Sequence, residues 1–169
     1  MLFGAEVAMV APAERNSSKH CGSILIFDGE PVLLDLLAVV LTREGYGVTT
    51  TPRSEEALGL ATSGRFDLAI ADLGLRHRDG CRLVRKLRQL SPEIPIVATT
   101  AYPASEIVSF AEEHAEILLS KPFAIGELVG AVREVLQRQL RGDRDTSSPL
   151  ATLEGLPATM SGAQVRASA

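Results

Sequence analysis

The sequence contains no tryptophan, and aromatic residues make up only 4% of its 169 residues. Hydrophobic residues nevertheless reach 46%, so any core must be built mainly from aliphatic side chains. Aliphatic cores of this kind suit a buried parallel sheet covered by helices. A chain of this length accommodates one domain with tails at its ends.

Positive charge is also in short supply. The chain has 17 lysines and arginines against 21 aspartates and glutamates, which gives a net charge of -4. Nucleic-acid-binding domains show the opposite balance, so we expect no nucleic-acid partner. A basic stretch over residues 82–88 is interpreted as a solvated helix face, because no aromatic residues alternate with its cations.

Cysteine occurs only twice, at Cys21 and Cys81, and neither lies in a pattern typical of a metal site or a disulfide framework. Both are expected to be free thiols in a reducing compartment. No apolar run is long enough to span a bilayer. The N-terminal apolar stretch lacks the basic residues of a signal peptide and is interrupted by Glu6. We therefore expect a cytoplasmic protein with no membrane contact.

Short apolar runs alternate with amphipathic segments along most of the chain. The runs, each typical of a buried strand, occupy residues 24–27, 47–51, 67–72, 94–100 and 117–120. The segments with helical spacing of apolar residues begin at Pro31, at Ser54, near Cys81, after Pro103 and at Ile125. This alternation predicts an α/β fold: a doubly wound, five-stranded parallel sheet in the flavodoxin-like order 2-1-3-4-5, with helices on both faces.

The composition changes at both ends of this patterned region. Residues 1–22 show no sustained periodicity, and residues 142–169 are rich in Gly, Ser, Thr, Ala and Pro. Segments with so little patterned apolar surface do not fold alone. We predict one folded domain over residues 23–141 with a disordered tail on either side.

Four strands of the predicted sheet end at a polar residue. These residues, from the first, third, fourth and fifth strands, are Asp28, Asp72, Thr100 and Lys121. Because the carboxyl ends of parallel strands share one edge of a sheet, we expect the four side chains to lie close together. A carboxylate can attack a phosphoryl group and form an acyl phosphate, while an ammonium and a hydroxyl stabilise the phosphoryl oxygens. The pattern therefore supports phosphoryl transfer to a carboxylate at this edge.

The motifs at these strand ends resemble those of response-regulator receiver domains. The matching segments, which fall between residue 23 and about residue 140, are ILIFDGEP, DLAIADLGLRHRDG, PIVATTAY and SKPF. The resemblance implies that Asp72 is the phosphoacceptor, Thr100 the switch hydroxyl and Lys121 the site lysine. These assignments are expectations for the structure to test.

The resemblance also implies a cofactor and partners. Mg²⁺ is expected to bind Asp28, Asp72 and the backbone carbonyl of Gly74. A histidine kinase or a histidine phosphotransfer protein is expected to supply the phosphoryl group. The face formed by residues 103–140 is expected to bind a downstream protein or a second copy of the chain.

Three positions depart from the family pattern. Gly29 takes the place of an acid, which should weaken metal binding, and the neighbouring Glu30 is a substitute carboxylate if its side chain turns away from the helix start. Arg76 replaces a proline and is either a solvated loop cation or a guanidinium that pairs with the site. Leu118 replaces an aromatic residue, so a conformational switch would depend mostly on Thr100 and the backbone.

Three hypotheses for the function follow. The first is a stand-alone receiver that is phosphorylated on Asp72 and signals by protein–protein contact, with no enzymatic activity beyond self-phosphotransfer and autodephosphorylation. The second is a pseudo-receiver that is never phosphorylated, which Gly29 and Leu118 favour. The third, a phosphoaspartyl hydrolase, is disfavoured because Gly74 stands where that chemistry requires a second acid. Nucleotide-binding motifs rich in glycine are absent from the sequence.

Overall fold

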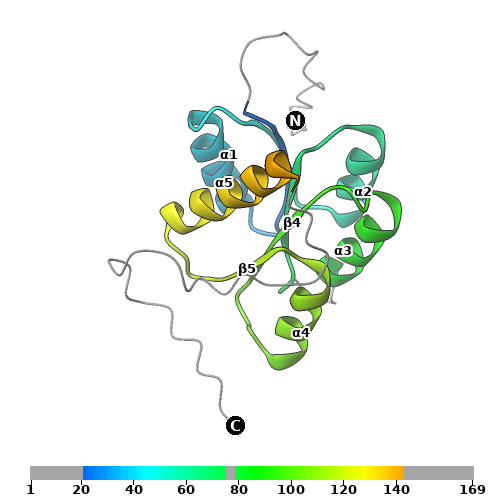
Figure 1. Ribbon diagram of the computed structural model, residues 1–169. Coiled ribbons are helices and arrows are strands. Elements are labelled where there is room, and N and C mark those ends of the chain that lie inside the picture. The colour runs from blue at the N-terminus through cyan, green and yellow to red at the C-terminus, as the bar shows by residue number, and fades with distance from the viewer. Residues whose placement is uncertain (1–20, 75–78, 143–169) are drawn as a thin grey trace, which may run out of the picture.

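The computed structural model describes residues 21–74 and 79–142, in which five strands alternate with five helices (Figure 1). In chain order these elements are β1 (Ser23–Phe27), α1 (Pro31–Arg43), β2 (Gly47–Thr51), α2 (Ser54–Ser63), β3 (Leu68–Asp72), α3 (Asp79–Leu90), β4 (Ile96–Thr100), α4 (Ser105–His114), β5 (Ile117–Ser120) and α5 (Ile125–Arg141). Apart from residues 21, 22 and 142, the predicted tails lie outside the described residues, as does Arg76. None of the helices in the described ranges is long and apolar enough to cross a bilayer.

The strands form one parallel sheet in the order β2-β1-β3-β4-β5. This confirms the predicted doubly wound topology. Its register pairs Phe27 with Ala71, Asp72 with Thr99, and Thr100 with Ser120. The carboxyl ends of four neighbouring strands, β1, β3, β4 and β5, therefore meet along one edge of the sheet.

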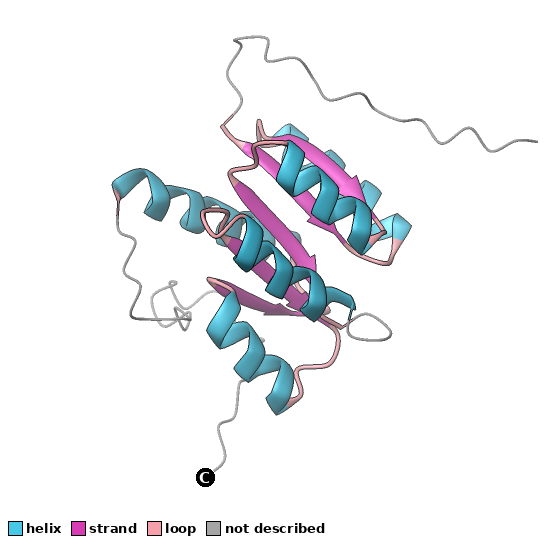
Figure 2. Cartoon of the chain, turned by 90° about the vertical axis from the view of Figure 1, so that its right-hand side faces the viewer, coloured by secondary structure: helices cyan, strands magenta, loops and turns pink. Residues whose placement is uncertain are grey.

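Helices cover both faces of the sheet, as Figures 1 and 2 show. Helices α1 and α5 pack on one face, where their leucines and valines contact Ile24 and Ile26 of β1. Helices α2, α3 and α4 pack on the other face, around Leu25 and Phe27. Burying each large aliphatic side chain contributes about 1.5–3 kcal/mol, so these two mainly aliphatic layers stabilise the sheet with few buried aromatic residues, among them Phe27 and Tyr46.

Two strands begin later than the sequence predicted. Strand β4 was expected from Ile94, but the Ile94 N–H donates to the carbonyl of Ser91 at 3.1 Å, in a turn. Pro95 has no N–H to donate, so the strand begins at Ile96. Strand β3 begins at Leu68, one residue after the predicted start. Both changes lie at the amino ends of the strands, away from the predicted site.

Helix α3 begins at Asp79, earlier than the predicted start near Cys81. Gly80 therefore lies in its first turn, directly against the backbone of β3. A Cβ atom built on Gly80 would lie 1.9 Å from the carbonyl oxygen of Asp72 and 2.9 Å from the Cα of Leu73. Only glycine allows so close an approach, and this approach brings α3 against the strand that carries Asp72.

Candidate functional site

The four predicted side chains lie at the carboxyl edge of the sheet. Asp28 follows β1, Asp72 ends β3, Thr100 ends β4 and Lys121 follows β5. Asp28, Asp72 and Thr100 are 2%, 5% and 0% exposed. The Lys121 side chain is 12% exposed. Three ionisable groups so far removed from water must compensate one another's charge.

The ammonium of Lys121 bridges the two carboxylates. Its Nζ donates to Asp28 Oδ2 at 2.7 Å and to Asp72 Oδ2 at 2.9 Å. The other oxygen of each carboxylate accepts a backbone N–H from two residues further on: Glu30 donates to Asp28 Oδ1 at 2.9 Å, and Gly74 donates to Asp72 Oδ1 at 2.8 Å. Each carboxylate is thus fixed by its own local turn, and the two turns are of the same kind. The shared lysine then holds the two carboxylates together.

Thr100 and Asp72 both lie next to Gly74. A Cβ atom built on Gly74 would lie 3.2 Å from Thr100 Oγ1 and 3.3 Å from Asp72 Oδ1. The Thr100 carbonyl accepts the backbone N–H of Lys121 at 2.7 Å, which joins β4 to the residue after β5. Its hydroxyl accepts the Tyr102 N–H at 3.1 Å and lies 3.3 Å from the Tyr102 carbonyl. The structure therefore brings Thr100 to the site, with its hydroxyl bound to the following loop.

Burial and hydrogen bonding set the charges in this cluster. Burial raises the pKa of Asp28, although the hydrogen bonds from Lys121 and Glu30 oppose the rise. Burial disfavours the ammonium of Lys121, but its hydrogen bonds to Asp28 and Asp72 outweigh that cost and raise the pKa of Lys121. Lys121 is therefore positively charged at neutral pH and offsets part of the negative charge of the buried carboxylates.

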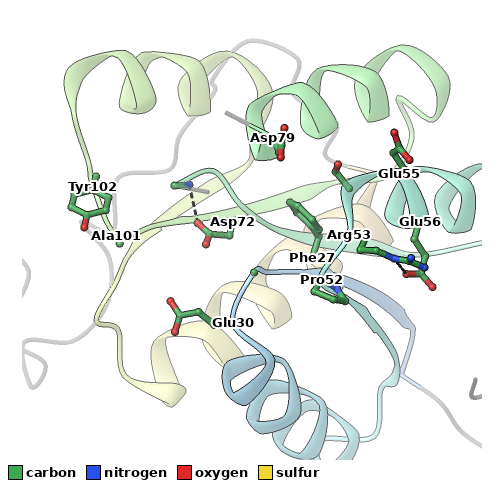
Figure 3. Close-up of a pocket in the computed structure, with 13 residues that line it drawn as sticks. Phe27, Glu30, Pro52, Arg53, Glu55, Glu56, Asp72, Asp79, Ala101 and Tyr102 are labelled. Atoms are coloured by element: carbon green, nitrogen blue, oxygen red, sulfur yellow. Dashed lines mark hydrogen bonds and ion pairs between the residues drawn. The ribbon is translucent and has the colours of Figure 1, made fainter. Parts of the chain in front are cut away.

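A cavity of about 1250 Å³ opens beside Asp72. Figure 3 shows this cavity, with Asp72 between Glu30 and Asp79 and with Tyr102 at one side. Its wall continues along the loop from β2 to α2, where Arg53 lies. The Asp72 carboxylate, although largely buried, thus faces a space that a small phosphorylated group can enter.

The donor atoms at this site fit a weakly held Mg²⁺. Within residues 21–74 and 79–142, no group of three or more His, Cys, Asp or Glu side chains is arranged to hold a metal. Mg²⁺ nevertheless binds proteins through one or two carboxylates and keeps several water ligands. Asp28 and Asp72 converge on one point, Lys121 Nζ, and so offer two carboxylates. Gly29 offers none, while Glu30 lines the same cavity as Asp72.

Arg88 has a structural role that the sequence did not reveal. We interpreted it as part of a solvated face, and this is wrong. Its guanidinium donates to the carbonyls of His114 at 2.8 Å and Ile94 at 3.0 Å, and to both carboxylate oxygens of Glu116 at 2.9 Å. The partners lie up to 28 residues away along the chain, so no local spacing could predict this contact between α3 and the sheet.

Comparison with known families identifies the family to which this fold belongs. Residues 24–133 match the response regulator receiver domain family. The chain belongs to this family. Receiver domains are phosphoacceptor signalling domains, generally not enzymes; they interact with histidine kinases and downstream effectors and generally bind Mg²⁺ for phosphorylation.

The relatives of this receiver domain include several full-length regulators. Response regulator MprA of Mycolicibacterium vanbaalenii is 32% identical over 134 residues, which cover 79% of this chain and 58% of MprA. Response regulator ArlR of Staphylococcus aureus is 34% identical over 120 residues, which cover 71% of this chain and 55% of ArlR. The chain thus spans little more than half the length of these relatives.

Solved structures show the same fold. A CheY-like receiver domain protein from Methanospirillum hungatei has a TM-score of 0.68 and 28% identity to this chain. The match covers 71% of this chain and 97% of that protein's chain. The response regulator TrrA of Thermotoga maritima, solved in complex with Mg²⁺ and BeF, has a TM-score of 0.60 and 31% identity, over 67% of this chain and 97% of its own.

Proposed function

We propose that this receiver domain accepts a phosphoryl group on Asp72 from a histidine kinase or a histidine phosphotransfer protein, and then signals through protein–protein contact. One observation supports this most directly. The Asp72 carboxylate, bound to the ammonium of Lys121 and adjacent to Thr100, faces an open cavity. A nucleophile, a cation and a hydroxyl in one pocket are the groups that phosphoryl transfer to a carboxylate requires.

The transfer forms one bond and breaks one. An oxygen of the Asp72 carboxylate attacks phosphorus and forms an acyl phosphate, while the bond from phosphorus to the donor's histidine nitrogen breaks. The bonding electron pair stays on that nitrogen, which can then take a proton from solvent. Lys121 exchanges its contact with Asp72 for a phosphoryl oxygen, and the Thr100 hydroxyl turns from Tyr102 to donate to another. Both groups thus stabilise the negative charge on the phosphoryl oxygens.

Asp28, Asp72 and the backbone carbonyl of Gly74 are the groups that we propose would hold Mg²⁺. A bound Mg²⁺ supplies further positive charge for the phosphoryl oxygens. The likeness to TrrA, which was solved with Mg²⁺ and BeF, supports this assignment. Because Gly29 contributes no carboxylate, we expect the affinity to be low.

The donor protein must reach the rim of the cavity, where α1 begins. Val32, Leu36 and Val39 of α1 are 82%, 46% and 50% exposed and lie on one side of the helix. We propose that this apolar stripe contacts the kinase or phosphotransfer protein. Residues 103–140 remain our proposed face for the downstream partner or a second copy, and the cytoplasm our proposed location.

Acetyl phosphate, a small donor that needs no docking surface, tests the proposal. In the presence of Mg²⁺, we expect intact-mass measurement to find a single added phosphoryl group on the wild-type chain and none on Asp72→Asn. Asp35→Asn, which removes an exposed carboxylate on α1, is the matched control and should be modified like the wild type. Full modification of Asp72→Asn would place the acceptor elsewhere, with Asp28 the first alternative.

A pseudo-receiver is the second candidate. It is favoured by Gly29 and by the double ion pair of Lys121, since this ammonium already binds both carboxylates without a metal. The same experiment separates the two functions. A wild-type chain that gains no phosphoryl group at any Mg²⁺ concentration, although it is folded, would leave only the pseudo-receiver.

A further inference from the structure

A second cavity, of about 400 Å³, lies between α2 and α3. Ser54, Glu55 and Asp79 line both this cavity and the larger one beside Asp72. The two hollows therefore form one continuous depression, and we call the part between the two helices the α2–α3 groove. The half-buried Leu58 gives it an apolar patch.

Three cations of α3 line the α2–α3 groove. Arg82, Arg85 and Lys86 follow i, i+3, i+4 spacing, so they share one side of the helix, and all three are exposed. Among the described residues, none of the three forms an ion pair with a carboxylate. Arg85 instead lies over the ring of Phe110, 5.5 Å from its centre. Adjacent like charges on a helix repel one another, so this side of α3 favours an anionic partner.

The residues around the groove indicate which class of anion it binds. The chain as a whole carries a net charge of -4, so these cations are not part of a general basic excess. Glu55 and Asp79 lie at the junction with the larger cavity and end the cationic stretch there, so the groove suits a short acidic segment better than a nucleic acid with a phosphate at every nucleotide. Among the described residues that line this cavity, none is aromatic, so bases would find no ring there to stack on. An acidic peptide with apolar residues matches both the cations and Leu58.

We propose that the α2–α3 groove binds an acidic segment of a partner protein, with aspartate or glutamate side chains on Arg82 and Lys86 and an apolar side chain on Leu58. The groove lies on the opposite face of the sheet from α1. A protein at this site and a phosphoryl donor at α1 can therefore bind the same receiver domain together. The proposal does not require phosphorylation of Asp72.

The test is a titration of the ¹⁵N-labelled full-length chain with a synthetic peptide of alternating glutamate and leucine, followed by amide chemical shifts. We expect shift changes confined to α2 and α3. An exposed ion pair changes affinity up to about fivefold. Arg82→Glu combined with Lys86→Glu should therefore weaken binding about tenfold or more, and Arg82→Gln with Lys86→Gln by a smaller factor.

Arg43→Glu combined with Arg141→Glu is the matched control. It makes the same change of charge at exposed positions on α1 and α5, on the other face, and should keep wild-type affinity. Equal weakening in both double variants would mean that net charge alone attracts the peptide, and the proposal would be wrong. It would also be overturned if a single-stranded oligonucleotide bound the groove more tightly than the peptide, or if sedimentation showed a dimer that the Arg82 and Lys86 substitutions dissolve.

Discussion

Two glycine residues hold Asp72, one at its side chain and one at its backbone. Its carboxylate accepts the amide of Gly74 at 2.8 Å, and its carbonyl oxygen lies in the space where a side chain at position 80 would begin. Neither glycine carries a reactive group. Both nevertheless determine where the carboxylate lies relative to Lys121 and Thr100, so the site depends on small residues as much as on charged ones.

Replacing Gly80 tests this dependence. Because the added Cβ of Gly80→Ala would meet the Asp72 carbonyl oxygen at 1.9 Å, α3 and β3 must separate. We expect a loss of about 1–3 kcal/mol in the free energy of unfolding and slower phosphorylation by acetyl phosphate. Urea denaturation measures the first effect. Gly59→Ala in α2 is the control, since nothing lies within 4 Å of its added Cβ, and it should be neutral or stabilise the chain by up to about 1 kcal/mol. Equal effects of the two substitutions would contradict the account.

Lys121 is the second residue on which the site depends. Lys121→Met leaves the buried carboxylates of Asp28 and Asp72 without their shared cation, which should reduce the free energy of unfolding by about 3–5 kcal/mol at neutral pH. Mg²⁺ can then occupy the place of the ammonium. We therefore expect added Mg²⁺ to raise the melting temperature of Lys121→Met more than that of the wild type. An identical response of the two chains to Mg²⁺ would argue against a shared site for the lysine and the metal.

At the scale of elements, the junction between β2 and α2 borders the cavity and is held by polar contacts. The hydroxyl of Thr51 donates to Glu56 Oε2 at 2.7 Å and accepts the N–H of Arg53 at 3.1 Å. The Arg53 guanidinium also contacts Glu56, at 3.2 Å. The hydrogen bond from Thr51 lowers the pKa of Glu56 most, and the hydrogen bond from Arg53 lowers it further. The N-cap residue of α2, Arg53, makes no side-chain cap hydrogen bond, so these contacts are what fixes its side chain and its backbone N–H.

The lowered pKa of Glu56 has a predictable effect on stability. A carboxylate whose pKa is lower in the folded chain stabilises the fold above its unfolded pKa, and this contribution disappears as the pH falls through the folded value. We expect Glu56→Gln to be less stable than the wild type at neutral pH, by less than about 1 kcal/mol because the pair is exposed. The difference should vanish at a pH below the ordinary value of 4.5. Urea denaturation of both chains over this pH range measures it, and a difference that grows on acidification would contradict this explanation.

The sequence predicted the type and order of the elements because each buried strand is a short aliphatic run and each helix carries an apolar stripe. It did not predict the start of α3, since glycine at position 80 favours a loop unless the close approach to Asp72 is known. The partners of Arg88 were missed for a similar reason, because they come together only when α3 packs against the sheet. Residue type and strand position were sufficient to place Asp28, Asp72 and Lys121 at one edge. The hydrogen bond of the Thr100 hydroxyl to Tyr102 depends on loop geometry and could not be predicted.

At the scale of the whole molecule, the site lies at the sheet edge between two differently covered faces. The loop that follows Thr100 leads from the site into α4, and Tyr102 in this loop is 73% exposed. If the Thr100 hydroxyl turns towards a phosphoryl oxygen, its hydrogen bond with the Tyr102 amide is lost. This gives a route from Asp72 to the proposed downstream face that does not require an aromatic residue at Leu118, which packs against the core beneath α2, α3 and α4.

The most direct measurement of the central claim is a titration of the ¹⁵N-labelled wild-type chain with beryllofluoride, which mimics a phosphoryl group, in the presence and absence of Mg²⁺. We predict that the amide signals of Gly74, Thr100, Tyr102 and Lys121 move together in the presence of Mg²⁺, and that Asp72→Asn abolishes the change. If none of these signals moves at saturating beryllofluoride and Mg²⁺, the cluster does not bind a phosphoryl group, and the receiver domain signals without phosphorylation of Asp72.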